Sequence, residues 1–192
     1  MKSHVGLFFG TFNPVHVGHM IIAQHMLEYS DMDQLWFMVT PHNPHKKKST
    51  LLDDRQRLHM VDLAIVDHVR MKASDEEFHL PQPSYTITTL THLSEKYPDK
   101  KFSLIMGMDN LESFHKWKNF DKIIEQHDIY VYPRPGHDGG QFGTHPKVHV
   151  IDAPNMEISA TRIRESLRDG KDLSYMVPNK VWEYLETSGF YR

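Results

Sequence analysis

Six short runs rich in β-branched and aromatic residues recur along the chain, and segments with helical spacing of apolar residues separate them. Alternating short strands and helices are typical of βαβ units, in which consecutive strands lie parallel in one sheet and the connecting helices cover it. The sequence therefore predicts an α/β fold, with a mostly parallel sheet of about six strands and helices on both faces. The strands are expected at residues 5–9, 35–39, 69–74, 102–106, 128–132 and 148–151.

The apolar spacing between and after these runs predicts helices. Asp53 is a candidate N-cap, Ser159 or Thr161 lies near another helix start, and Gly170 and Gly189 are expected to end the last two helices. We expect residues 1–192 to form a single domain, with a helical part of about 158–192 packed on it. The helices are expected near 20–27, 53–67, 84–97, 158–170 and 177–190, with long loops at 40–52 and 133–146.

Composition excludes several classes of function. The net charge is −3, from 22 basic and 25 acidic residues, so the chain as a whole has no electrostatic attraction to nucleic acid or anionic membranes. There are no cysteines, which excludes disulfides, thiolate nucleophiles and cysteine-based zinc sites. The apolar run before Gly10 is too short for a secretory signal, and no run reaches the roughly 18 apolar residues of a membrane span. We expect a cytoplasmic protein without nucleic-acid or membrane partners.

Ligands of open parallel sheets bind beyond the carboxyl ends of the strands. The stretch GTFNPVHVGH, residues 10–19, follows the first predicted strand and carries His16 and His19. Gly10 is expected to permit a tight turn and Gly18 to leave room for a ligand. Free N–H groups and the positive end of the helix dipole favour an anion at this helix start, and two imidazoles on the same turn add donors.

Histidine spacing alone decides little, because the chain has 15 histidines and an HxxH pair is expected about once by chance. The second such pair, His42 and His45, lies between prolines and indicates an exposed basic loop. For His16 and His19, helix capping and zinc binding are alternatives, but zinc lacks a third ligand. Surface or packing roles are expected for His4, His59, His68, His92, His115 and His149, while His137 and His145 are open to adventitious metal binding.

A dinucleotide-binding oxidoreductase would carry GxGxxG after the first strand, and this chain does not. GTFNPVHVGH instead resembles the GxFDPxHxGH signature of the nucleotidyltransferase superfamily, and ISATRIR, residues 158–164, resembles its ISSTxxR signature. Further segments resemble bacterial nicotinate-mononucleotide adenylyltransferases: PHNPHK (41–46), RQRLHM (55–60), SYTITTL (84–90), GMDNLESFHKW (107–117) and RPG (134–136). Two departures are Asn13 in place of Asp and Ala160 in place of the second Ser.

This resemblance implies a Rossmann-like, doubly wound sheet and an enzyme that joins ATP to nicotinate mononucleotide, with Mg²⁺ accompanying ATP and no protein metal ligands. It implies catalytic roles for His16, His19 and Arg164. The ATP-binding residues it implies are Gly10, Thr11, Phe12, His16, Gly18, His19, Lys46, Gly107, Asp109, Ile158, Ser159, Thr161 and Arg164. For the mononucleotide it implies Tyr85, Thr86, Asp109, Trp117 and Arg134, with Trp117 stacking on the pyridine ring.

Other functions remain open at this point. Nicotinamide-mononucleotide and phosphopantetheine adenylyltransferases share the superfamily motifs, and a nucleotide sensor without turnover would share the fold. A class I tRNA synthetase fragment shares HxGH, but its anticodon-binding domain and KMSKS loop do not fit in 192 residues.

Overall fold

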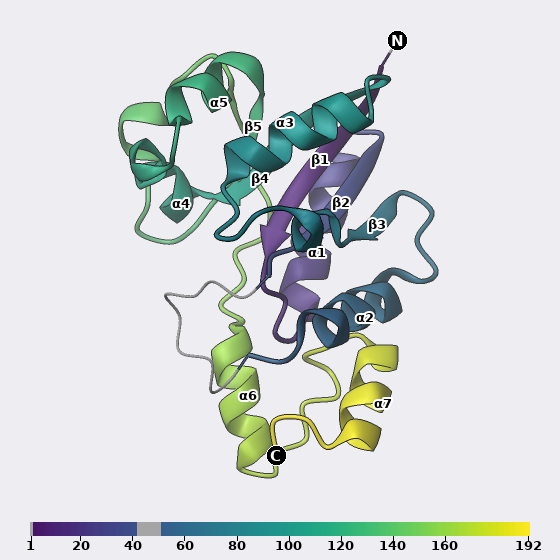
Figure 1. Cartoon of the computed structure of the whole chain (residues 1–192). Helices are drawn as coiled ribbons and strands as arrows, with labels where there is room; N and C mark the ends of the chain where they lie inside the picture. Colours follow the sequence, from purple (N-terminus) through teal and green to yellow (C-terminus); the bar gives the residue numbers. More distant parts are fainter. Residues whose placement is uncertain (1, 42–50) are drawn as a thin grey trace.

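The computed structural model describes residues 2–41 and 51–192, and its central element is a six-stranded sheet (Figure 1). The strand order is β3-β2-β1-β4-β5-β6, and every neighbouring pair is parallel. The predicted parallel α/β sheet is therefore confirmed, in the doubly wound order of the Rossmann fold. The strands are β1 (Ser3–Gly10), β2 (Gln34–Val39), β3 (Met71–Ser74), β4 (Lys100–Gly107), β5 (Ile129–Tyr132) and β6 (Val148–Val150).

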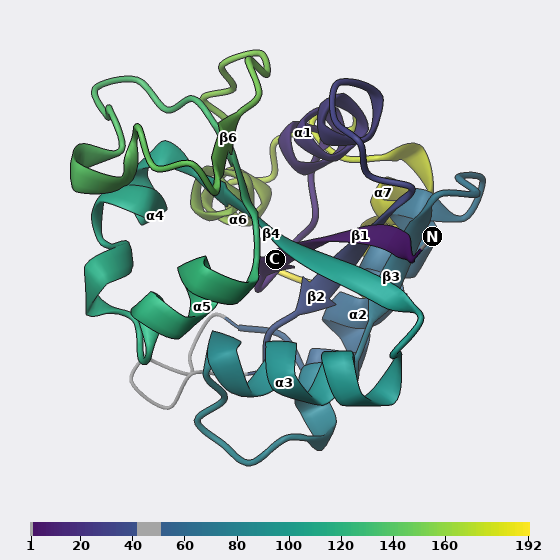
Figure 2. The same ribbon diagram turned by 90° about the horizontal axis from the view of Figure 1, so that it is seen from above.

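The sheet separates two apolar cores because successive side chains of a strand point to opposite faces. On one face, Phe8 and Phe37 pack with the helices α1, α2, α6 and α7. On the other face, Leu7 and Trp36 pack with α3, α4 and α5. Figure 2 shows α1 and α3 on opposite sides of the sheet. Helices on both faces are thus confirmed.

The helices predicted from apolar spacing are present, with their expected caps. Asp53 accepts a hydrogen bond from the Arg55 N–H at the start of α2, and Ser159 accepts one from the Arg162 N–H at the start of α6. Gly170 and Gly189 follow α6 and α7 with φ of 70° and 66°, a left-handed conformation that suits glycine. The bounds are α1 (Val17–Glu28), α2 (Asp54–Ile65), α3 (Thr86–Lys96), α6 (Ala160–Arg168) and α7 (Asn179–Ser188).

The connection from β4 to β5 contains helices that the sequence pattern did not predict. They are α4 (Met108–Glu112), η3 (Phe114–Lys116) and α5 (Phe120–Gln126), and the predicted loops also contain the single turn η4 (Gly140–Phe142). The 75–86 connection holds η2 (Glu76–His79). These helices are too short to show a clear apolar period, and Asn119 before α5 is left-handed and makes no side-chain cap bond, although asparagine is a usual N-cap residue.

The sheet order reverses between β1 and β4, so connections leave their carboxyl ends toward opposite faces and open a crevice between them. Beyond this edge lie α6 and α7, and the chain ends beside them (Figure 1). Within the described residues, no helix is long and apolar enough to span a bilayer.

Candidate active site

A cavity of about 300 Å³ lies at the carboxyl end of β1. His16 and His19 line it from the start of α1, and Ile158, Ser159 and Ala160 line it from the segment that leads into α6. The two motifs are directly bonded, since the Arg164 Nη1 group donates to the Asn13 carbonyl oxygen at 2.8 Å. The expectation that these two distant segments meet at one edge of the sheet is therefore confirmed.

The two histidine rings are stacked, with 3.7 Å between their centroids and 22° between their planes. His19 Nδ1 accepts a hydrogen bond from the His16 backbone N–H at 3.2 Å. In the neutral ring this contact leaves the proton on Nε2, because one nitrogen of a neutral imidazole accepts and the other donates. His19 thus offers the cavity a neutral N–H donor in a fixed orientation.

Their surroundings favour the neutral form of both imidazoles. Burial and, secondarily, the positive charge of Arg134 lower the pKa of His16 to about 4. Burial, with His16 and Arg134 adding smaller effects, lowers the pKa of His19 well below its ordinary value. An anion in the cavity would raise the pKa of both histidines, because it stabilises the protonated form.

The GTFNP turn differs in detail from the expected glycine turn. The left-handed residue is Phe12, with φ of 45°, whereas Gly10 is not left-handed. A Cβ on Gly10 would lie 2.8 Å from the Phe12 ring, so glycine is needed because that ring folds back over it. A Cβ on Gly18 would lie 3.1 Å from His16 Nδ1, so Gly18 makes room for the imidazole.

The start of α1 offers fewer free donors than the sequence suggested. The Val17 N–H donates to the Met176 carbonyl oxygen at 3.0 Å, and the His16 N–H is used by His19. The helix start therefore contributes chiefly through its dipole and the His19 ring, since these N–H groups are occupied within the protein.

Asn13 and Arg164 are joined to the end of the chain. The Tyr191 hydroxyl donates to Asn13 Oδ1 at 2.5 Å, and the Leu52 N–H donates to the same oxygen at 3.3 Å. Arg164 Nη2 also bonds the Thr161 hydroxyl at 3.2 Å. Thr161 thus contacts Arg164 and is exposed, while Ser159 caps α6 and lines the cavity.

Comparison with known proteins identifies the family. The cytidylyltransferase-like family model matches residues 7–166. A protein of Flavobacterium johnsoniae named "probable nicotinate-nucleotide adenylyltransferase" is 60% identical, over 98% of both chains. A protein of the same name from Cytophaga hutchinsonii is 46% identical, over 97% of both. The chain belongs to the nicotinate-nucleotide adenylyltransferase family.

A solved structure supports the fold of this family. The nicotinic acid mononucleotide adenylyltransferase of Plasmodium falciparum, solved in complex with NaAD, superposes with a TM-score of 0.83 at 17% identity. The alignment covers 98% of this chain and 97% of that one. At this identity the likeness shows the Rossmann-like fold.

Two more cavities in this adenylyltransferase-family chain adjoin the first. A middle cavity of about 210 Å³ shares Phe9 and Thr11 with the histidine cavity. An outer cavity of about 390 Å³ shares Pro83, Ser84 and Thr86 with the middle one. The three cavities therefore follow one another along the carboxyl edge of the sheet, from the histidines to the start of α3.

The outer cavity brings together the residues expected to bind a pyridine ring. Tyr85, Thr86 and Trp117 line it, together with Lys116 and Lys118. Trp117 is half-buried and packs edge-on against Phe114, with 5.4 Å between ring centroids. The Lys118 ammonium lies 4.3 Å from the centre of the Tyr85 ring, and the α3 N-terminus receives no side-chain cap.

Arg134 lines the histidine cavity, whereas Asp109 does not. The guanidinium Nε of Arg134 lies 3.8 Å from an Asp109 carboxylate oxygen, and the Arg134 guanidinium carbon lies 5.2 Å from the centre of the Tyr132 ring. A Cβ on Gly107 would lie 2.3 Å from the Asp109 carboxylate, so glycine at the end of β4 lets that carboxylate fold back. Lys46, like His42 and His45, falls outside the described residues.

Arg57 is a site residue that sequence reasoning missed. It is fully buried, and its Nη1 donates to the carbonyl oxygens of Thr11 at 2.6 Å and Thr40 at 2.9 Å, while Nε donates to that of Leu52 at 3.1 Å. An ion pair with Asp54 completes its contacts. Arg57 therefore fixes the GTFNP turn against α2. The RQRLHM segment contained it, but no local pattern distinguished a buried arginine from an exposed one.

Four buried side-chain atoms have no hydrogen-bond partner among the described residues: His16 Nδ1, Glu77 Oε2, Arg134 Nε and Arg164 Nε. All four belong to residues that line the histidine and middle cavities or bond directly to the GTFNP turn. Buried polar groups in native proteins are nearly always paired, so such a cluster is expected where a ligand or ordered water supplies the partners.

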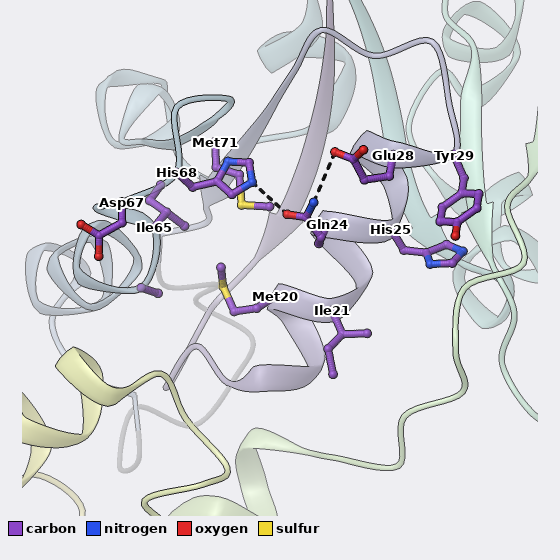
Figure 3. A pocket seen from close by; sticks show the side chains of 11 residues that line it. Met20, Ile21, Gln24, His25, Glu28, Tyr29, Ile65, Asp67, His68 and Met71 are labelled. Atoms are coloured by element: carbon purple, nitrogen blue, oxygen red, sulfur yellow. Dashed lines mark hydrogen bonds between the residues drawn. The ribbon is translucent and has the colours of Figure 1, made fainter.

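A further cavity, of about 550 Å³, lies elsewhere, between α1 and the end of α2 (Figure 3). Met20 and Ile21 contribute apolar surface, and the Gln24 side chain bonds both His68 and Glu28. This cavity is bordered by Met71, at the amino end of β3, so it lies away from the strand ends where ligands of parallel sheets bind. Among the described residues, no group of three His, Asp or Glu side chains is placed to hold a metal ion, and His137 instead pairs with Glu112 at 2.7 Å.

Proposed function

We propose that this chain transfers the AMP group of ATP to nicotinate mononucleotide, forming nicotinic acid adenine dinucleotide and pyrophosphate. The observation that carries the proposal is the bond between the two signature motifs beside the histidine cavity. This cavity shares lining residues with the middle cavity, which in turn shares lining residues with the Trp117 cavity. Relatives over nearly the whole chain carry the name of this activity.

The reaction needs no protein base. A phosphate monoester has a second pKa of about 6, so the attacking oxygen of the mononucleotide is already ionised at neutral pH. This oxygen forms a bond to the α-phosphorus of ATP, and the bond from that phosphorus to the β-phosphate bridging oxygen breaks. The protein must align two anions and stabilise the charge that moves to the pyrophosphate.

The residues of the histidine cavity suit this task, together with Arg164, which is bonded to the cavity residue Asn13. We assign to His19 Nε2–H a hydrogen bond to the reacting phosphate, since its proton is fixed by the Nδ1 contact with the His16 backbone. His16, stacked beneath it, contributes a second imidazole on the same side. Arg164 would grip the departing β- and γ-phosphates, with Ser159 and the α6 N-terminus beside it.

Magnesium fits this site as the ion that accompanies ATP. Among the described residues, no carboxylate lines the histidine cavity. Phosphate oxygens and water would therefore be the ligands of the ion, which would supply charge neutralisation between the phosphates when bound. Lys46 is assigned to the triphosphate by the motif resemblance alone. We also propose a cytoplasmic location, which suits a chain without cysteines.

The outer cavity would hold the nicotinate ring. Trp117 offers a flat face for the electron-poor pyridine, and the uncapped start of α3 offers backbone N–H groups at Thr86 to the ring carboxylate. Lys116 and Lys118 add positive charge nearby. Arg134 is assigned to the phosphate region, and Asp109 to a ribose hydroxyl at its edge.

The test is pyrophosphate release from ATP with each of three acceptors: nicotinate mononucleotide, nicotinamide mononucleotide and phosphopantetheine. We expect the highest kcat/KM for nicotinate mononucleotide and no release without an acceptor. A preference for the amide would overturn the choice of substrate. Binding of ATP and the mononucleotide without any release would show a sensor instead of an enzyme.

A further inference from the structure

Two adjacent buried glutamates in η2 have opposite surroundings. Glu76 is bonded by the Lys96 ammonium at 2.9 Å and by the Tyr97 hydroxyl at 2.7 Å, and His92 lies at 3.0 Å. Burial alone would raise the pKa of Glu76, but these partners lower it to about 2. Both oxygens of the Glu76 carboxylate therefore have hydrogen-bond donors within the protein.

Glu77 is buried to the same degree, at 3% exposed, but it is not fully paired. Its Oε1 accepts the Thr89 hydroxyl at 2.7 Å, whereas Oε2 has no hydrogen-bond partner among the described residues. Burial raises the pKa of Glu77, while the Thr89 and Ser84 hydroxyls partly oppose this effect. An unpaired carboxylate oxygen in the interior is costly unless something else donates to it.

The position of Glu77 indicates which group donates a hydrogen bond to its Oε2. Glu77 lines the middle cavity, which lies between the histidine cavity and the Trp117 cavity. A mononucleotide bound with its phosphate at the histidines and its ring at Trp117 would place its ribose in between. The phosphate and the ring carboxylate are both anionic and would be repelled by Glu77, so the ribose hydroxyls are the suitable donors. Buried carboxylates bind ribose hydroxyls in other nucleotide sites.

We propose that Glu77 is a substrate-binding residue whose Oε2 accepts a hydrogen bond from a ribose hydroxyl of nicotinate mononucleotide, while Thr89 holds its Oε1. This inference rests on the proposed function. It adds to that function a residue that distinguishes ribose from deoxyribose and that keeps anionic groups of the substrate out of the middle cavity.

The experiment crosses enzyme variants with substrate analogues. kcat/KM is measured for wild type and Glu77→Ala with nicotinate mononucleotide and with its 2′-deoxy and 3′-deoxy analogues. With the natural substrate, we expect the kcat/KM of Glu77→Ala to be about 10- to 100-fold lower than that of wild type. With the analogue that lacks the contacted hydroxyl, we expect the variant and wild type to have nearly the same kcat/KM. Equal losses with all three substrates, or faster turnover of any of them by the variant, would overturn the proposal.

Two further variants separate binding from folding. Glu76→Gln perturbs the neighbouring buried glutamate, which does not line the middle cavity, and should keep the wild-type preference for ribose. If Glu77→Ala does not fold, Glu77→Gln preserves the side-chain volume and is expected to show the same dependence on the hydroxyl, at about 3- to 10-fold. Wild type that releases no pyrophosphate with nicotinate mononucleotide would refute the proposed function, whereas normal wild-type turnover with hydroxyl-independent losses in the variant would refute only the role of Glu77.

Discussion

The two ends of the sheet treat buried polar groups in opposite ways. At the amino end they are paired within the protein: buried His4 Nε2 lies 2.7 Å from buried Ser103 Oγ, and the half-buried Asp128 faces Lys101 at 2.8 Å and Lys147 at 3.7 Å. At the carboxyl end, four buried atoms have no partner among the described residues, although they include two guanidinium nitrogens.

This difference separates stability from function between the two ends of one sheet. Paired groups at the amino end contribute to folding, since each bond replaces one made to water. Unpaired groups at the carboxyl end oppose folding and are useful only when a ligand supplies the missing partners. A residue's pairing therefore predicts whether its substitution changes stability or turnover.

The largest expected effect is on Arg57, which lies at the carboxyl end but is fully paired. Arg57→Ala leaves the carbonyl oxygens of Thr11 and Thr40 without their buried donor, and Asp54 without its cation. We expect the free energy of unfolding to fall by about 3–5 kcal/mol, measured by urea denaturation. If the free energy of unfolding fell by less than about 1 kcal/mol while turnover was abolished, the end of the sheet at which a residue lies, rather than its pairing, would decide whether it serves stability or turnover.

His19→Ala is expected to act on turnover. Losing one donor to the reacting phosphate should lower kcat by roughly 10²–10³, with the fold retained. The matched control is His4→Ala at the amino end, which removes the partner of buried Ser103. It should lower the free energy of unfolding by about 1–3 kcal/mol and leave kcat near wild type. Near-normal turnover by His19→Ala would contradict the assigned role.

The burial of His16 makes the free energy of unfolding depend on pH. Its pKa is about 4 in the folded protein and about 6.5 when unfolded, so the unfolded chain takes up a proton first as the pH falls. Stability should therefore decrease from pH 7 to pH 5, and His16 accounts for about 2 kcal/mol of that decrease. His16→Gln should flatten the curve of unfolding free energy against pH by this amount. An unchanged curve would show that His16 is not buried in the neutral form.

The smallest effect concerns the chain end. Tyr191→Phe removes the hydroxyl that donates to Asn13 Oδ1. The backbone carbonyl oxygen of Asn13 accepts the hydrogen bond from Arg164 Nη1. A single such bond contributes about 0.5–1.5 kcal/mol, so we expect the KM for ATP to rise about two- to tenfold while kcat changes little. A fall in kcat with an unchanged KM would instead assign Tyr191 to the chemical step.

Local signals were sufficient for much of this molecule. Strand runs, the Asp53 and Ser159 caps and the two glycine stops lie within a few residues of what they specify, and parallel strands bring their carboxyl ends to one edge. The sequence thus predicted that the two motif segments meet, as the bond from Arg164 to the Asn13 carbonyl oxygen shows. Contacts with no local signature were missed: Tyr191 bonds a residue 178 positions away, and Arg57 one 46 positions away.

Glu76 and Glu77 also differ in contacts that the local sequence does not signal, although they are neighbours in the chain. The two are identical in type, adjacent and both buried, yet only the packing of α3 gives Lys96 to one and a cavity to the other. Gly10 was recognised as part of a turn, but the reason for it, the ring of Phe12 lying over it, depends on a φ of 45° that no motif specifies.

The most direct test is a crystal structure of the protein with a non-hydrolysable ATP analogue and nicotinate mononucleotide. We expect the triphosphate to lie between His16, His19 and Arg164, with the mononucleotide ribose beside Glu77 and its ring on Trp117. Each of the four unpaired atoms would then be within hydrogen-bond reach of ligand or of water that the ligand orders. Nucleotide bound instead in the 550 Å³ cavity between α1 and α2, with the carboxyl edge unchanged, would contradict this assignment.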